Sequence, residues 1–97
     1  MRCKAGDIVK IKTWKEMKKE YGLTHNRDIE CKLTFVRTME EYLNKNFPDR
    51  IVEIEAVDEK YEFYFIRGSG DQWGDDMIKE KVVYEPIKSR FDILDIR

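Results

Sequence analysis

The first regular pattern along the chain is an alternation of apolar and polar residues that predicts a β-strand at 8–12. Val9 and Ile11 occupy alternate positions, with Lys10 and Lys12 beside them. Side chains two residues apart lie on one face of a strand. We therefore expect Val9 and Ile11 to face a core and the two lysines to face outward.

The next segment changes to helical spacing. Thr13 and Glu16 are placed as a capping box, in which the threonine hydroxyl accepts the amide of the fourth residue and the glutamate accepts the threonine amide. Apolar residues spaced by three and four positions then share one helix face. Gly22 stands where a glycine commonly ends a helix. These signals predict a helix at 14–21.

A similar pattern follows a polar loop. The loose alternation of residues 29–35 predicts a short strand or an extended arm, with its odd-numbered residues on one face. Thr38 and Glu41 then form a second capping box. An apolar stripe follows, and Pro48 stops the helical pattern. We expect a second, short helix at about 39–45.

The centre of the chain predicts a β-hairpin. The segment 51–57 alternates, so that Val52, Ile54 and Ala56 point inward and the glutamates between them point outward. Residues 58–60 are polar and form the turn.

The partner strand, 61–66, is apolar at nearly every position, so the pattern does not separate its two faces. We expect Phe63 and Phe65 to face the core. A strand with aromatic residues on both faces is either covered on both sides or exposes one of them as a contact surface. Tyr64 is the residue expected at that surface.

The segment after the hairpin predicts the remaining elements. Trp73 begins a short strand, and residues 75–78 form one helical turn whose acidic start suits the helix dipole. Residues 82–84 form a closing strand. The tail at 90–96 has strand propensity and is expected to pair at a sheet edge. Because such an edge strand can also pair with a second copy of the chain, we expect a monomer or a weak homo-oligomer.

Short strands, one tight hairpin and short helical insertions at about 14–21 and 39–45 predict a mainly β fold, a small five-stranded barrel. Three short motifs resemble a group of small uncharacterised phage and prophage proteins of Gram-positive bacteria: GDIVKIKxWxxM at 6–17, the Tyr21-Gly22 pair, and WxxDMI at 73–78. The resemblance implies that the barrel is SH3-like. We expect a single domain at 1–97, with the barrel core at about 5–84 and a C-terminal extension at 85–97.

Composition narrows the class of protein. Ninety-seven residues allow one domain, and the 12% of aromatic residues is too high for a disordered chain. No run of 18 apolar residues is present, and the N-terminal residues lack the apolar block of a signal peptide. We expect a cytoplasmic protein without membrane contact, in which Cys3 and Cys31 are reduced.

The formal net charge of −1 conceals an uneven distribution. Residues 1–20 carry seven basic and three acidic groups, whereas residues 51–78 carry two basic and eight acidic groups. The two segments either present opposite charges on different faces or neutralise each other within the fold, and the second interpretation is favoured. A nucleic-acid-binding domain usually has a clear basic excess, which this chain lacks.

Catalytic chemistry has few candidates. The candidate nucleophiles need a neighbouring base, and His25, the one histidine, lies in an unrelated polar loop. These candidates are Cys3, Cys31, Ser69 and Ser89. The same histidine and two scattered cysteines do not supply the ligands of a metal site. Residues 68–70 lack the lysine and the following helix of a phosphate loop. We expect no enzyme activity, no cofactor and no metal.

Aromatic residues are the remaining candidates for function. Rigid, amphipathic rings suit protein interfaces, and rings near the loops of SH3-like barrels often form a ligand groove. The main hypothesis is a non-catalytic module that docks a protein partner, as an adaptor or an inhibitor, through such rings and an acidic rim at 53–62 and 71–76. The residues assigned to this surface are Trp14, Tyr21, Tyr61, Tyr64, Trp73, Asp75 and Asp76.

Two alternatives remain open. In the first alternative, Trp14 and Trp73 are core residues that fill the two ends of the barrel. Tyr61 and Tyr64 are then the better candidates for a binding surface. In the second, the chain binds nucleic acid through a basic stripe, with Trp14 as a stacking ring, although the acidic remainder of the chain would repel phosphate. The lysines of this stripe are Lys10, Lys12, Lys15, Lys18 and Lys19.

Overall fold

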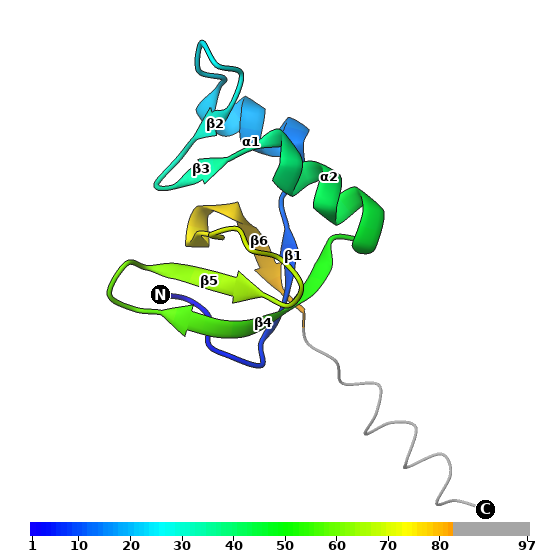
Figure 1. Ribbon diagram of the computed structural model, residues 1–97, viewed down its shortest axis with the longest axis vertical. Coiled ribbons are helices and arrows are strands. Elements are labelled where there is room, and N and C mark those ends of the chain that lie inside the picture. Colours follow the sequence, from blue (N-terminus) through cyan, green and yellow to red (C-terminus); the bar gives the residue numbers. More distant parts are fainter. Residues whose placement is uncertain (83–97) are drawn as a thin grey trace, which may run out of the picture.

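The computed structural model describes residues 1–82, in which four strands form one antiparallel sheet. The strands are β1 (Ile8–Ile11), β4 (Ile51–Asp58), β5 (Phe63–Ile66) and β6 (Ile78–Lys81). Their order across the sheet is β5-β4-β1-β6 (Figure 1). The first strand of the chain therefore lies in the middle of the sheet, between two strands formed forty or more residues later.

The other elements cover one side of this sheet. They are α1 (Trp14–Tyr21), a hairpin of β2 (Ile29–Glu30) and β3 (Thr34–Phe35), α2 (Arg37–Asn46) and the 3₁₀ turn η1 (Asp75–Met77). Figure 1 shows α1, the β2–β3 hairpin and α2 gathered together on that side. The fold is a small mixed α/β globule.

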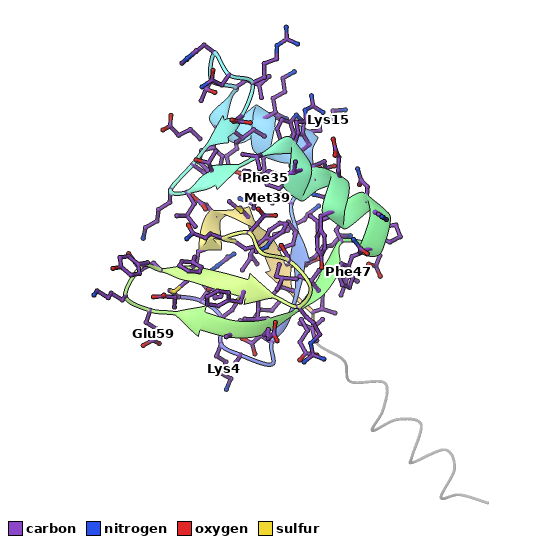
Figure 2. The ribbon with its side chains drawn as sticks, viewed as in Figure 1. Lys4, Lys15, Phe35, Met39, Phe47 and Glu59 are labelled. Atoms are coloured by element: carbon purple, nitrogen blue, oxygen red, sulfur yellow. The ribbon has the colours of Figure 1, made fainter. Side chains whose placement is uncertain are left out.

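The hydrophobic core lies between the sheet and this covering layer. Val9 and Ile11 face it, as expected, and are buried. Figure 2 shows Phe35 and Met39 between the hairpin, α2 and the sheet. Packed aromatic and aliphatic side chains therefore hold the two layers together. The largest fully buried side chains are Trp73, Tyr64, Phe35, Ile11, Met17, Ile29, Met39, Leu43, Ile54, Ile66, Met77 and Val9.

The first predicted helix and its capping box are confirmed. The Glu16 amide donates to Thr13 Oγ1 at 3.1 Å, and the Thr13 amide donates to Glu16 Oε1 at 2.9 Å. The Thr13 amide and then Lys79, which pairs with Glu16 at 2.9 Å, lower the pKa of Glu16 to about 2. Gly22 ends the helix with φ +74°, a conformation that costs little only for glycine.

The second helix exists, but its predicted cap at Thr38 is wrong. The helix covers Arg37–Asn46 instead of 39–45, and Val36 is the N-cap residue. The extended backbone of Val36 places its carbonyl where it accepts the amides of Met39 and Glu40, at 3.0 and 3.3 Å. Strand pairing of Phe35 fixes the chain just before this point, so tertiary structure and not a side-chain cap sets the start of α2.

Residues 29–35 form a hairpin and not the single strand or extended arm that their alternation indicates. Ile29 pairs with Phe35, and the Cys31 amide donates to the Leu33 carbonyl at 3.0 Å across the turn. The Lys32 amide donates to Asp76 Oδ2 at 2.7 Å. A partner 44 residues away thus stabilises the turn, and no local pattern reveals it.

A buried ion pair joins α2 to the sheet. Arg50 exposes only 6% of its surface and adopts φ +64°, and its guanidinium contacts Glu40 at 2.7 Å. The same guanidinium donates to the backbone carbonyls of Ile11 and Lys12 at the end of β1. Arg50 therefore holds together the end of β1, the start of β4 and the first turn of α2.

In the strand predicted at 61–66, Tyr64 and Phe65 have the opposite orientation to the one expected: Tyr64 faces the core and Phe65 faces outward. β5 begins at Phe63 and not at 61, after a turn at residues 59–62. Tyr64 pairs with Val57 and is fully buried, whereas Phe65 is 40% exposed. An irregularity in β4 between Ile54 and Ala56 shifts the pairing by one residue, and this shift decides which side chains of an all-apolar strand turn inward.

No closed barrel forms within residues 1–82, so the expected five-stranded barrel is not found there. β5 and β6 are the two edges of the four-stranded sheet. Trp73 contributes one isolated bridge to Tyr64 in place of the predicted strand, and the two residues exchange backbone hydrogen bonds of 2.7 and 3.2 Å. This bridge covers the middle of the β5 edge, while lysines on β6 discourage pairing at the other edge.

The last predicted elements are confirmed only in part. The helical turn after Trp73 is present as η1. The closing strand is β6 at Ile78–Lys81, which lies before the predicted 82–84 because the chain re-enters the sheet directly after η1. Residues 83 and 84, and the predicted edge strand at 90–96, lie outside the described part of the chain.

Candidate protein-binding surfaces

The open face of the β4–β5 hairpin exposes aromatic rings. Phe65 projects from this face with 40% of its surface exposed, and its ring packs edge-to-face with that of Phe63, with centroids 4.9 Å apart. Tyr61, in the hairpin turn, is 64% exposed, and Lys60 Nζ lies 5.3 Å from its ring centroid. We call Tyr61 and Phe65, with the neighbouring carboxylates of Glu53, Glu55 and Glu59, the hairpin face; Phe63 is buried beneath it.

The carboxylates of the hairpin face form no salt bridge within residues 1–82, although Arg67 lines the same hollow as Glu53 and Glu55. Glu53, Glu55 and Glu59 are all exposed. Glu53 and Glu55 also border a hollow of about 210 Å³, whose apolar wall is formed by Phe47 and Ile66. The predicted rim at 53–62 is thus acidic and accessible on β4, beside exposed rings.

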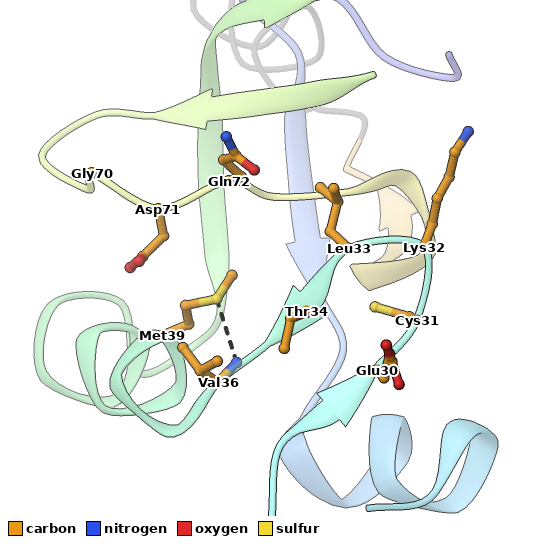
Figure 3. A pocket seen from close by; sticks show the side chains of 10 residues that line it. All are labelled: Glu30, Cys31, Lys32, Leu33, Thr34, Val36, Met39, Gly70, Asp71 and Gln72. Atoms are coloured by element: carbon orange, nitrogen blue, oxygen red, sulfur yellow. Dashed lines mark hydrogen bonds between the residues drawn. The ribbon is translucent and has the colours of Figure 1, made fainter. Parts of the chain in front are cut away.

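A larger open groove lies between the β2–β3 hairpin, the start of α2 and the loop before Trp73 (Figure 3). Its volume is about 600 Å³. Leu33, Val36 and Met39 give it an apolar part, and Figure 3 shows Asp71 and Glu30 toward opposite ends. We call it the hairpin groove, and its lining residues are Glu30, Cys31, Lys32, Leu33, Thr34, Val36, Met39, Gly70, Asp71 and Gln72.

The loop that forms one wall of this groove is held by a hydrogen-bond network. The buried Trp73 donates through Nε1 to Ser69 Oγ at 3.1 Å, and the Asp71 amide donates to the same oxygen at 3.2 Å. The Ser69 amide donates in turn to the Ile66 carbonyl at 3.0 Å. Asp71 is therefore presented from a loop anchored in the core.

The carboxylate of Asp75 is used in hydrogen bonds within the fold and is not free to contact a partner. Its carboxylate accepts the Arg2 amide at 3.3 Å and the hydroxyl of buried Tyr64. Tyr64 Oη also accepts the Cys3 amide at 3.0 Å. Burial and the hydrogen bond to Asp75 raise the pKa of Tyr64 above its ordinary value. Tyr64 and Asp75 thus attach the N-terminal residues to the core.

Asp76 also has a structural role. One oxygen, Oδ2, accepts the Lys32 amide, while Oδ1 is buried next to Gly74. Burial and then the Asp76 carboxylate raise the pKa of the Cys31 thiol, which keeps this half-buried thiol protonated near neutral pH. The arrangement stabilises the hairpin turn and does not activate the cysteine.

The remaining aromatic candidates divide between core and surface. Trp73 is fully buried. Trp14 is half-buried, with the Phe35 centroid at 5.5 Å and the Arg37 guanidinium 4.4 Å from its ring centre. Tyr21 is exposed, and desolvation followed by the carboxylates of Asp76 and Glu20 raises its pKa to about 12. Of the five aromatic residues proposed from the sequence, only Tyr21 and Tyr61 are exposed.

The five lysines of the basic stripe differ in exposure and pairing. Lys15, Lys18 and Lys19 are exposed on α1, whereas Lys12 pairs with Glu20 at 2.9 Å and Lys10 is half-buried on the sheet. None of the five salt bridges found within residues 1–82 joins a basic residue of 1–20 to an acidic residue of 51–78. The favoured neutralisation between these segments is therefore not made through ion pairs there.

Two features of these surfaces were missed from the sequence. The sequence pattern reveals neither the exposure of Phe65 nor the hairpin groove, because the first depends on strand register and the second on the turn at 31–33. No helix within residues 1–82 is long and apolar enough to cross a membrane. Within the same residues, no group of three or more potential metal ligands is found.

Comparison of the chain with protein-family models, curated proteins and solved structures gives no match.

Proposed function

We propose that this chain is a non-catalytic binding module that docks a protein partner through the hairpin face. The observation that carries the proposal is the exposure of Phe65 and Tyr61 next to three exposed carboxylates that form no salt bridge within residues 1–82. Aromatic rings at the centre of an interface contribute much of its binding energy. Carboxylates around them favour a partner with a basic surface and speed its approach.

The resemblance to phage and prophage proteins supplies the biological setting of this proposal. A small phage protein with an acidic, aromatic face suits an adaptor or an inhibitor of a basic host protein.

Capture from a lysate of a Gram-positive bacterium tests the proposal with a matched pair of variants. Phe65→Ser removes a ring from the hairpin face, whereas Leu23→Ser removes an equally exposed apolar side chain from the loop after α1, since each is 40% exposed. We expect the wild type and Leu23→Ser to retain the same basic protein, and Phe65→Ser to lose it. Retention by all three chains, or loss by both variants, would contradict the proposal.

Nucleic-acid binding is the alternative outcome. The stacking ring that it requires, Trp14, is packed against Phe35 and Arg37. Binding of nucleic acid would therefore depend on the exposed lysines of α1. Chromatography on immobilised DNA and RNA at 50 and 300 mM salt decides between the two. Retention that falls steeply with salt, and that is lost in a Lys15→Glu, Lys18→Glu double variant, favours the alternative.

A further inference from the structure

We infer that the hairpin groove is a second, separate docking site, and that its ligand is an extended peptide in which basic residues flank an aliphatic one. The site lies across the covering layer, formed by the β2–β3 hairpin and the loop at 70–72. It shares no residue with the hairpin face. The inference therefore does not depend on the function proposed above.

The apolar part of the groove accounts for the aliphatic residue of the ligand. Leu33 and Val36 are half-buried, and Met39 is buried, with its sulfur accepting the Val36 amide at 3.5 Å. Such a surface gains free energy when an aliphatic side chain covers it. Leu33 and Val36 supply the accessible part of this surface, and the buried Met39 side chain supports them from the core.

The charges on the rim account for the basic residues. Among the described residues, Lys32 is the only basic one that lines the groove, and it is already paired with Glu62 at 2.9 Å. Glu30 and Asp71 have no salt bridge within residues 1–82. With one carboxylate toward each end and apolar side chains between them (Figure 3), charge complementarity favours a cation on each side of an aliphatic residue.

The wall that carries Asp71 is ordered before any ligand arrives. Its loop is fixed through Ser69 to the buried Trp73, and the other wall is fixed by the Asp76 carboxylate, which accepts the Lys32 amide. A site with ordered walls loses little conformational entropy on binding. This order is what allows a shallow groove to select a short peptide.

Panning of a displayed random 12-residue peptide library against the whole chain tests the inference. We expect the enriched peptides to share a basic-aliphatic-basic pattern and to bind less tightly at 300 mM than at 50 mM salt. Glu30→Lys and Gln72→Lys place a positive charge on the two walls and should weaken binding at least tenfold. Glu59→Lys introduces the same charge as Glu30→Lys on the hairpin face and should change binding less than twofold.

Alkylation of Cys31 provides a second readout that does not depend on the variants. Cys31 lines the groove, while Cys3 is buried and serves as the internal control. A bound peptide should slow the reaction of Cys31 with iodoacetamide at pH 8.5. The inference is overturned if no peptide family is enriched, if the enriched peptides lack basic residues, if Glu59→Lys weakens binding as much as Glu30→Lys, or if Cys31 remains unprotected. Phe65→Ser should leave peptide binding intact, so failure here is distinct from failure of the hairpin face.

Discussion

Replacement of Glu40 by glutamine is expected to destabilise the protein strongly, because it leaves a buried guanidinium without its charged partner. Arg50 is 6% exposed and contacts both oxygens of Glu40, at 2.7 and 3.2 Å. Removing one member of a buried ion pair costs about 3–5 kcal/mol. Glutamine keeps the shape of the side chain, and Arg50 retains the carbonyls of Ile11 and Lys12. We therefore expect a loss of about 3 kcal/mol, at the lower end of that range.

The matched control is Glu62→Gln, which makes the same chemical change in an exposed pair. The side chains of Lys32 and Glu62 are 58% and 51% exposed, although their distance of 2.9 Å is close to the 2.7 Å of the Arg50–Glu40 pair. Exposed pairs contribute less than about 1 kcal/mol. Since about 1 kcal/mol shifts the melting temperature of a domain of this size by about 4–8 °C, Glu40→Gln should melt about 12–24 °C below the wild type and Glu62→Gln only a few degrees below it.

Thermal and urea unfolding, followed by circular dichroism, measure both variants. Urea midpoints with an unchanged m-value would show that stability, and not the compactness of the unfolded chain, has changed. If the two variants lose the same free energy within about 0.5 kcal/mol, burial of the Arg50 guanidinium is not the cause, and the reasoning about the junction of β1, β4 and α2 is wrong.

Three further predictions concern single side chains. Gly22→Ala should lower the unfolding free energy by about 1 kcal/mol, because the residue has φ +74°; an unchanged urea midpoint would contradict this. The pKa of Glu16 is lowered to about 2 from 4.5, so its stabilising contribution is present above pH 5 and is lost as the pH falls toward 2; in Glu16→Gln, acid unfolding should show a shallower dependence on pH across that range. Tyr64→Phe removes the hydroxyl that contacts Asp75 and the Cys3 amide and should cost about 1–3 kcal/mol, which thermal melts would detect.

Local signals predicted the elements whose boundaries depend on neighbouring residues. The helix at 14–21 was correct at both ends because Thr13, Glu16 and Gly22 act on residues next to them. The faces of β5 were not predictable in this way. Its four apolar residues do not alternate with polar ones, so the irregularity in β4 decides the orientation of Tyr64 and Phe65. Barrel closure likewise depends on pairing between strands far apart in the sequence.

The candidate site was harder to predict, because formal charge does not show which carboxylates are free. The acidic segment 51–78 contains both structural and accessible carboxylates. Asp58, Asp75 and Asp76 each accept a backbone amide, respectively from Tyr61, Arg2 and Lys32. Because these three carboxylates serve local structure, the negative charge left for a partner is concentrated on β4 and on the rim of the hairpin groove. The Lys32–Glu62 pair joins the turn of the β2–β3 hairpin to the turn of the β4–β5 hairpin. The folded structure therefore decides which carboxylates remain unpaired on the two surfaces, and the number of acidic residues in the sequence does not.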